Sequence, residues 1–124
     1  MDKLTIIGAG LLGGSIGLAA RASGLAKRVS ALVRRPESVA ECQALGIADE
    51  VTLDPAEAVT GADLIVLCTP ISGMAGLAKR TLPDLKPGAV ITDVGSTKQQ
   101  LVAELTPLCA GAGARFVGSH PMAG

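Results

Sequence analysis

The feature that most constrains this chain is a glycine-rich segment close to its start. A short apolar stretch, residues 4–7, runs into Gly8-Ala9-Gly10-Leu11-Leu12-Gly13, and a helical pattern follows at once. This G-x-G-x-x-G spacing stands between a predicted strand and a predicted helix, which is the setting that a dinucleotide-binding motif requires. In such a loop Gly8 permits a tight turn, Gly10 lets a pyrophosphate come close to the backbone, and Gly13 lets the helix pack against the strand.

Two interpretations of this motif stay open when it is taken alone. In the first, the free N–H groups and the positive end of the helix dipole face the phosphates of a dinucleotide. The residues that hold this cofactor are then those of the loop, namely Gly8, Gly10, Leu11, Leu12 and Gly13. In the second, the segment is a glycine-rich turn between a strand and a helix and binds nothing. The rest of the sequence is needed to choose between these two interpretations.

The length and composition of the chain indicate a single domain. The chain has 124 residues, of which 48% are hydrophobic, and this is enough to bury one substantial core over residues 1–124. Its formal net charge is zero and Phe116 is its one Phe, Tyr or Trp residue, so we expect no binding of nucleic acid. Cys42, Cys68 and Cys109 are odd in number and far apart, which indicates reduced thiols in a cytoplasmic protein and no metal site.

The first twenty residues also invite a different interpretation. Lys3 is followed by the uncharged residues 4–20, a run that could be taken for a signal peptide or a membrane span. Five glycines interrupt this run at the spacing of a phosphate-binding loop, and the apolar blocks between them are short. We therefore expect neither a targeting segment there nor a membrane partner.

Apolar runs and helical patterns alternate along the chain. Strands are expected at residues 4–7, 29–33, 50–53, 62–68, 89–94 and 115–118, and helices at 11–22, 36–45, 72–82 and 97–109, with a brief helix after Asp54-Pro55. This alternation predicts an α/β fold of the Rossmann type, a doubly wound parallel sheet with helices on both faces and right-handed crossovers. The common strand order of this fold, 3-2-1-4-5-6, makes the first and fourth strands neighbours.

Four distinctive loops follow predicted strands and are expected to meet at one edge of the sheet. Besides the glycine segment they are Thr69-Pro70, Gly95-Ser96-Thr97-Lys98 and residues 119–124. In this fold ligands bind outside the carboxyl ends of the strands. We therefore favour the nucleotide-binding interpretation and expect Thr69 and Pro70 to line the cofactor cleft. A plain turn at the end of the strand is the alternative for these two residues.

Two arginines indicate which dinucleotide is bound. In this fold an acidic residue about 20 positions past the loop holds the ribose 2′-hydroxyl of NAD. Here Arg34, which lies 21 residues after Gly13, closes the predicted second strand, and Arg35 follows it. A guanidinium can grip a 2′-phosphate with two hydrogen bonds, so the sequence favours NADP over NAD. The alternative is a solvated basic pair like the doublets Lys27-Arg28 and Lys79-Arg80.

Three segments occur in the order in which a known enzyme family has them. They are Gly-Ala-Gly-Leu-Leu-Gly-Gly-Ser at residues 8–15, Asp-Val-Gly-Ser-Thr-Lys at 93–98 and Gly-Ser-His-Pro-Met-Ala-Gly at 118–124. The first is common to many dehydrogenases, whereas the last is far more specific. In these segments the chain resembles the prephenate and arogenate dehydrogenases of tyrosine biosynthesis, and the resemblance extends over its whole length.

The resemblance implies an oxidative decarboxylation. A hydride leaves C4 of a cyclohexadienyl ring for the nicotinamide, the ring carboxylate departs as CO2, and the ring becomes aromatic; prephenate and arogenate both fit as the small-molecule substrate. His120 matches the family's catalytic histidine, and a neutral imidazole can accept the hydrogen bond of the C4 hydroxyl. Ser96 matches a family serine near that hydroxyl and the nicotinamide. An exposed loop histidine and a helix-capping serine are the alternatives for these residues.

Members of this family continue past the last segment into a helical domain that supplies dimer contacts and substrate-binding residues. The chain ends at Gly124, so the resemblance implies a piece of a longer homodimeric enzyme. Two further interpretations stay open. A non-catalytic dinucleotide-binding module has no need of a proton acceptor such as His120. A related dehydrogenase of the β-hydroxyacid type shares the glycine loop, but its final motif looks different.

Overall fold

The computed structural model of this chain describes residues 1–8, 10–68, 71–93 and 99–118. The strands are β1 (Lys3–Ile7), β2 (Arg28–Leu32), β3 (Glu50–Thr52), β4 (Leu64–Leu67), β5 (Val90–Asp93) and β6 (Arg115–Gly118). The helices are α1 (Leu11–Ser23), α2 (Pro36–Leu45), α3 (Pro55–Val59), α4 (Ile71–Thr81) and α5 (Gln99–Gly111), together with the 3-10 turn η1 (Leu82–Asp84).

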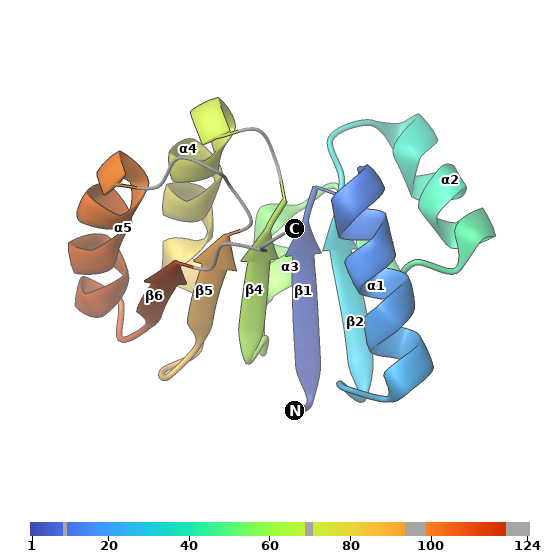
Figure 1. Cartoon of the computed structure of the whole chain (residues 1–124), viewed down its shortest axis with the longest axis horizontal. Coiled ribbons are helices and arrows are strands. Elements are labelled where there is room, and N and C mark those ends of the chain that lie inside the picture. Colours follow the sequence, from blue (N-terminus) through green and yellow to red (C-terminus); the bar gives the residue numbers. More distant parts are fainter. Residues whose placement is uncertain (9, 69–70, 94–98, 119–124) are drawn as a thin grey trace, which may run out of the picture.

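The strands form one six-stranded parallel sheet in the order β3-β2-β1-β4-β5-β6 (Figure 1). This confirms the predicted Rossmann-type fold and its strand order. Strand β1 lies in the middle, hydrogen-bonded to β2 on one side and to β4 on the other. Because all strands run in the same direction, every strand-to-helix loop leaves from the upper edge of the sheet in Figure 1, which is its carboxyl edge.

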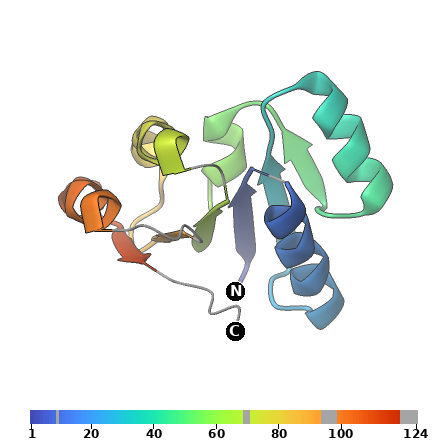
Figure 2. The same ribbon diagram turned by 45° about the horizontal axis from the view of Figure 1, so that its top comes forward.

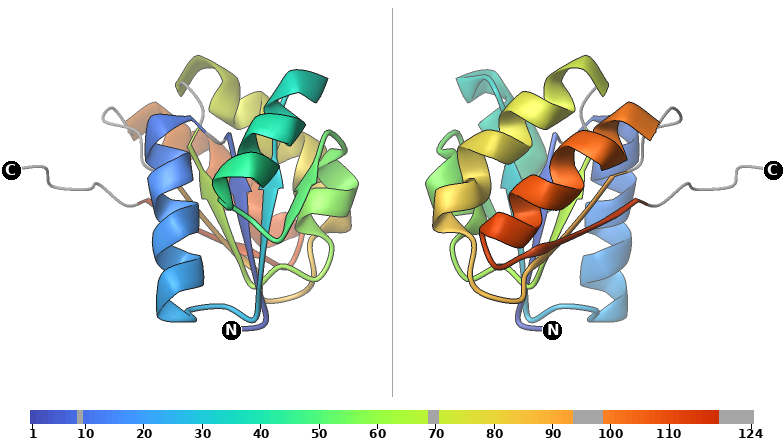
Figure 3. Two further views of the ribbon diagram at one scale, coloured as in Figure 1. Left: turned by 90° about the vertical axis from the view of Figure 1, so that its right-hand side faces the viewer. Right: turned by 90° about the vertical axis from the view of Figure 1, so that its left-hand side faces the viewer.

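Helices cover both faces of the sheet, as the alternation of elements predicts. Helices α1 and α2 pack on one face, and α3, α4 and α5 on the other (Figure 2). Figure 3 shows the sheet from its edges, with α1 on one side and α3 and α4 on the other. Each strand alternates its side chains between the two faces, so a separate apolar cluster fills each space between sheet and helices.

The two clusters share the sheet as a common wall. The first cluster, on the α1–α2 face, comprises Leu4, Ile6, Ala20, Ala26, Val29, Ala31, Val33, Cys42, Ile47, Ala48 and Val66. The second cluster, on the α3–α5 face, comprises Ile7, Leu32, Ala58, Val59, Ala62, Ile65, Leu67, Ala78, Leu85, Ala89, Ile91, Leu105, Cys109, Ala114 and Phe116. The runs of Ile, Leu and Val in β1 and β4 belong to both clusters, as expected for strands buried on both faces.

Several local signals in the sequence account for the ends of the helices. Gly24 and Gly46 end α1 and α2 in the left-handed conformation, with φ of 67° and 68°, which a residue without a Cβ adopts at no steric cost. The carboxylate of Asp54 accepts a 3.1 Å hydrogen bond from the N–H of Ala56 and so caps α3.

Several predicted boundaries shift by one or two residues. Strand β4 begins two residues later and ends one residue earlier than predicted, β5 begins one residue later, and α5 ends two residues later. Strand β2 begins one residue earlier than predicted and ends at Leu32, although the N–H of Val33 still donates to the carbonyl of Thr52 at 3.0 Å. Helix α4 ends at Thr81, and Pro83 lies inside the 3-10 turn η1 that follows. Proline is tolerated there because the first N–H groups of a helical turn need no partner within it.

Candidate functional site

The glycine loop joins the central strand to the first long helix. Gly8 has a φ of 91°, a conformation that favours glycine, and its N–H donates to the carbonyl of Leu32 at 3.0 Å. Gly10 occupies the N-cap position of α1 in an extended conformation, and no side chain caps the helix. The first turn of α1 also contains no acidic residue. The positive end of α1 is therefore available to an anionic ligand at the carboxyl edge of the sheet.

Gly13 and Gly10 meet very different surroundings. A Cβ added to Gly13 would lie 2.1 Å from the carbonyl oxygen of Gly8 and 3.3 Å from the Cβ of Cys68, so only glycine allows α1 to pack this close to the loop. A Cβ added to Gly10 would meet no atom within 4 Å. The space beside Gly10 is thus open to a group that approaches the backbone. This combination of tight packing and open backbone fits the pyrophosphate of a dinucleotide.

Sequence reasoning did not assign a role to Gly14 or Gly17, which fix the position of α1. A Cβ on Gly14 would lie 3.2 Å from the Cδ1 of Ile47, and one on Gly17 would lie 2.5 Å from the carbonyl oxygen of Ile47. Gly13 and Gly17 are one helical turn apart, so they share the helix face that packs on the sheet. That four-residue spacing is the signal that could have identified this close-packed face of α1.

Cys68 was also not among the predicted site residues, although it follows β4 directly beneath the loop. Its N–H donates to the carbonyl of Ile7 at 2.8 Å, and its Cβ faces Gly13. Burial raises the pKa of the Cys68 thiol to about 11. The side chain is therefore a neutral thiol at physiological pH and packs under the loop as a small apolar group, since nucleophilic chemistry requires the thiolate.

Arg34 and Arg35 leave the carboxyl edge next to the loop, where the prediction placed them. Both are exposed, and in the part of the chain that the structure describes neither guanidinium forms an ion pair or hydrogen bond. The other basic doublets differ in this respect. Lys27 pairs with Asp2 at 3.3 Å, Arg28 with Glu50 at 3.4 Å, and Lys79 with Glu104 at 2.6 Å.

Four predicted site residues, Thr69, Pro70, Ser96 and His120, lie outside the described residues. The strand ends that precede them are described. Leu67, Asp93 and Gly118 are aligned across β4, β5 and β6, and each is the last residue of its strand. The three segments that carry these residues therefore leave the sheet from its carboxyl edge, on which the glycine loop also lies.

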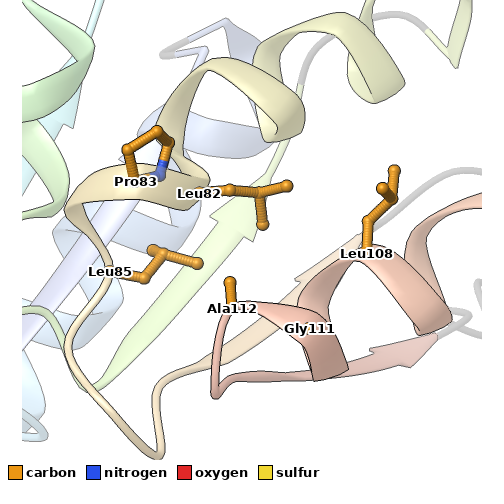
Figure 4. A pocket seen from close by; sticks show the side chains of 6 residues that line it. All are labelled: Leu82, Pro83, Leu85, Leu108, Gly111 and Ala112. Atoms are coloured by element: carbon orange, nitrogen blue, oxygen red, sulfur yellow. The ribbon is translucent and has the colours of Figure 1, made fainter.

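One further hollow lies away from this edge. Figure 4 shows an open depression of about 460 Å³ between η1 and the end of α5, lined by Leu82, Pro83, Leu85, Leu108, Gly111 and Ala112. Its lining residues precede β5 and β6, so it faces the amino edge of the sheet and takes no part in the candidate site.

Among the described residues no cluster of His, Cys, Asp and Glu has the arrangement of a metal site. Those residues also include no helix with the length and hydropathy needed to span a membrane.

Comparison with known proteins identifies similar sequences and folds. Residues 16–124 match the family model described as "Prephenate dehydrogenase, nucleotide-binding domain". A prephenate dehydrogenase of Lactococcus lactis is 38% identical over 126 aligned residues, which cover 100% of this chain and 35% of the relative.

Two solved structures have the same fold at similar identity. The arogenate dehydrogenase of Synechocystis superposes with a TM-score of 0.88 at 30% identity, covering 98% of this chain and 41% of that one. The prephenate dehydrogenase of A. aeolicus, solved in complex with hydroxyphenyl propionate and NAD+, gives a TM-score of 0.88 at 34% identity, covering 100% of this chain and 43% of that one. The chain thus spans less than half the length of these relatives.

Proposed function

Because this chain belongs to the family of prephenate dehydrogenase nucleotide-binding domains, we propose that it is the cofactor-binding part of an enzyme that oxidises and decarboxylates prephenate or arogenate. The observation that carries the proposal is the glycine loop. It presents an open backbone at Gly10 and an uncapped positive helix end at the carboxyl edge of the sheet. The longer enzyme is proposed to be a cytoplasmic homodimer.

The residues of the loop fit a nicotinamide dinucleotide. The backbone of Gly8, Gly10, Leu11, Leu12 and Gly13 would hold the pyrophosphate, with Thr69, Pro70 and Ser96 lining the rest of the cleft. A bound nicotinamide supplies the hydride acceptor for the oxidation. The loop itself positions the phosphates, because its N–H groups and the α1 dipole attract negative charge.

His120 and Ser96 are proposed to act on the substrate. A neutral His120 imidazole accepts the proton of the C4 hydroxyl as that oxygen becomes a carbonyl, and Ser96 forms a hydrogen bond near the same oxygen. The alignment of Asp93 with Gly118 supports this pairing, because Ser96 and His120 follow these two residues in the sequence by three and two positions. In an active enzyme that contains this chain, His120→Asn is expected to lower turnover by roughly 10²–10⁴-fold. Turnover close to that of the unmodified enzyme would exclude His120 as the proton acceptor.

The exposed arginine pair supports NADP as the preferred cofactor. Arg34 and Arg35 stand at the end of β2 without an acidic partner among the described residues, whereas an NAD site has a carboxylate at this place. Each guanidinium group is planar and can donate two parallel hydrogen bonds to the oxygens of a 2′-phosphate. In the other two doublets, Lys27, Arg28 and Lys79 form ion pairs, which favours Arg34 and Arg35 as the candidates for the phosphate.

Calorimetric titration of this chain with NADP and with NAD tests the proposal. We expect tighter binding of NADP, and we expect Arg34→Asp to weaken it by about ten- to a hundredfold while NAD binding changes little. Arg80→Asp is the matched control, since it makes the same charge reversal in another exposed doublet. Equal effects of the two variants would attribute the preference to net charge. Binding of neither dinucleotide would contradict the cofactor site itself.

A further inference from the structure

Ile47 lies against the two glycines that let α1 pack closely. Its side chain is buried and belongs to the first cluster. A Cβ built on Gly14 would lie 3.2 Å from the Cδ1 of Ile47. One built on Gly17 would lie 2.7 Å from the Cγ2 of Ile47 and 2.5 Å from its carbonyl oxygen. Ile47 therefore occupies the space that the two missing side chains leave beside α1.

Two residues close to Ile47 in the chain are bound to α1 and to β2. Arg21 of α1 donates to the carbonyl of Gly46 at 2.6 Å and pairs with the carboxylate of Asp49 at 3.1 Å. The second carboxylate oxygen of Asp49 accepts a 2.7 Å hydrogen bond from the N–H of Val29 on β2. These contacts on both sides of Ile47 hold it at a fixed place between α1 and the sheet.

Ile47 also continues directly from α2, which covers the same face of the sheet as α1 (Figure 2). Gly46 ends this helix, and the N–H of Ile47 donates to the carbonyl of Cys42 in its last turn at 3.2 Å. At the other end, Arg35 is the N-cap residue of α2 and Arg34 precedes it. A helix of ten residues moves as one body, so the contact of Ile47 with α1 also fixes the start of α2.

This connection joins two anion positions of the proposed cofactor site. The N-terminus of α1 is proposed to bind the pyrophosphate, and Arg34 and Arg35 the 2′-phosphate. NADP carries both groups, whereas NAD lacks the 2′-phosphate. A ligand that is held at two points loses affinity when the distance between the points changes, whereas a ligand that lacks the second contact moves with the first.

We propose that Ile47 is a positioning residue for the choice of cofactor. Its contact with Gly14 and Gly17 sets the separation of α1 and α2, and with it the spacing between the glycine loop and the arginine pair. This role rests on the function proposed above and adds to it a residue outside both the loop and the pair. It predicts changes in NADP affinity that NAD does not share.

An exchange of size across this contact tests the role by calorimetry with NADP and with NAD. In Gly14→Ala the added methyl group presses on the Cδ1 of Ile47. We expect this variant to bind NADP about tenfold more weakly and to keep its NAD affinity within about threefold. The double variant Gly14→Ala/Ile47→Val has no Cδ1 atom there, so its NADP affinity should return to within about threefold of the unmodified chain.

Gly76→Ala is the matched control. It adds the same methyl group to α4, where a Cβ meets no atom within 4 Å, and should leave both affinities unchanged. Ile47→Leu is a second variant, in case Gly14→Ala does not fold. It keeps the volume of the side chain but removes the Cγ2 branch that faces Gly17, and it should show the same selective loss of NADP affinity.

Several results would overturn the positioning role. They are an equal loss of both dinucleotides, unchanged NADP affinity in a folded Gly14→Ala or Ile47→Leu variant, and a selective loss of NADP in Gly76→Ala. Failure of the added Ile47→Val substitution to restore NADP affinity would do the same, as would failure of both Gly14→Ala and Ile47→Leu to fold.

The unmodified chain separates this role from the proposed function. If it binds neither dinucleotide, the cofactor site is wrong, and if it binds both equally, the preference for NADP is wrong; the role of Ile47 fails in either case. If it prefers NADP and Gly14→Ala keeps that preference, the proposed function stands and only the role of Ile47 is wrong. Selective loss in Gly14→Ala with recovery in the double variant supports both.

Discussion

At the scale of single residues, we expect Gly10 and Gly13 of the glycine loop to have separable roles. Gly13→Ala places a methyl group 2.1 Å from the carbonyl oxygen of Gly8, so we expect a loss of stability of about 2 kcal/mol or more. The methyl group added in Gly10→Ala meets no atom within 4 Å, so we expect this variant to lose less than about 1 kcal/mol of stability. It should nevertheless bind NADP more weakly. Chemical denaturation and calorimetry measure the two effects. Unchanged NADP affinity in Gly10→Ala would contradict a pyrophosphate at this position.

Two buried hydroxyl groups, on Thr5 and Ser30, differ in whether they form a hydrogen bond. Thr5 and Ser30 are aligned on β1 and β2, and both are buried. The Thr5 hydroxyl donates to the carbonyl of Ala58 at 2.5 Å, whereas the Ser30 hydroxyl oxygen has no hydrogen-bond partner in the part of the chain that the structure describes. We expect Thr5→Val to lower the free energy of unfolding by about 1 kcal/mol and Ser30→Ala to leave it equal or slightly higher. Urea titrations of both variants measure this difference, and a larger loss for Ser30→Ala would be the opposite of the expected order.

At the scale of elements, the ends of the helices could be predicted from the sequence, because each end is determined by the few residues around it. Gly24 and Gly46 mark the ends of α1 and α2, and prolines stand at the first positions of α2 and α3. The short strands are less well defined by the sequence, since β3 has three residues and its partly buried side chains form no continuous apolar run. The close approach of α1 to Ile47 was also not foreseen, because it depends on contacts between elements.

Helix α3 shows how a distant residue stabilises a short element. It has five residues, too few to be stable alone, and Lys3 on β1 donates to the carbonyls of Thr60 at 2.9 Å and Glu57 at 3.3 Å. Burial lowers the pKa of this ammonium group. We expect Lys3→Met to lower stability by about 1–3 kcal/mol and to speed amide hydrogen exchange in α3. Lys27→Met, which removes only an exposed ion pair, serves as the control and should cost less than about 0.5 kcal/mol.

At the scale of the whole molecule, the strand order and the edge from which the candidate loops leave could be predicted, whereas the pairing of charges could not. Alternating elements predict the common strand order of this fold, and that order brings the carboxyl ends of β1, β4, β5 and β6 to one edge of the sheet. The partners of Lys27, Arg28 and Lys79 depend on side chains brought close by the fold. The sequence therefore showed three similar basic doublets, and the structure distinguishes them by their ion pairs.

The amino edge of the sheet is held by a carboxylate whose importance the sequence does not reveal. Asp63 precedes β4, and its side chain accepts hydrogen bonds from the N–H groups of Asp2 at 2.8 Å and Lys3 at 3.0 Å and from the ammonium of Lys86. It thus joins the beginning of β1, the approach to β4 and the turn before β5. The Lys86 hydrogen bond and the two backbone N–H groups lower the pKa of Asp63 from 3.8 to about 2.

This pKa predicts how the stability of the whole chain depends on pH. Because the folded-state pKa of Asp63 is below its unfolded value of 3.8, its contribution is fully present above about pH 4 and is lost as the pH falls toward 2. We expect Asp63→Asn to be less stable than the unmodified chain at pH 7 and to lose less stability between pH 4 and pH 2. Asp84→Asn, at an exposed carboxylate on η1, should follow the unmodified chain. Urea titrations across this range measure the slopes, and equal slopes for Asp63→Asn and the unmodified chain would show that the amino edge is not the acid-sensitive part of the fold.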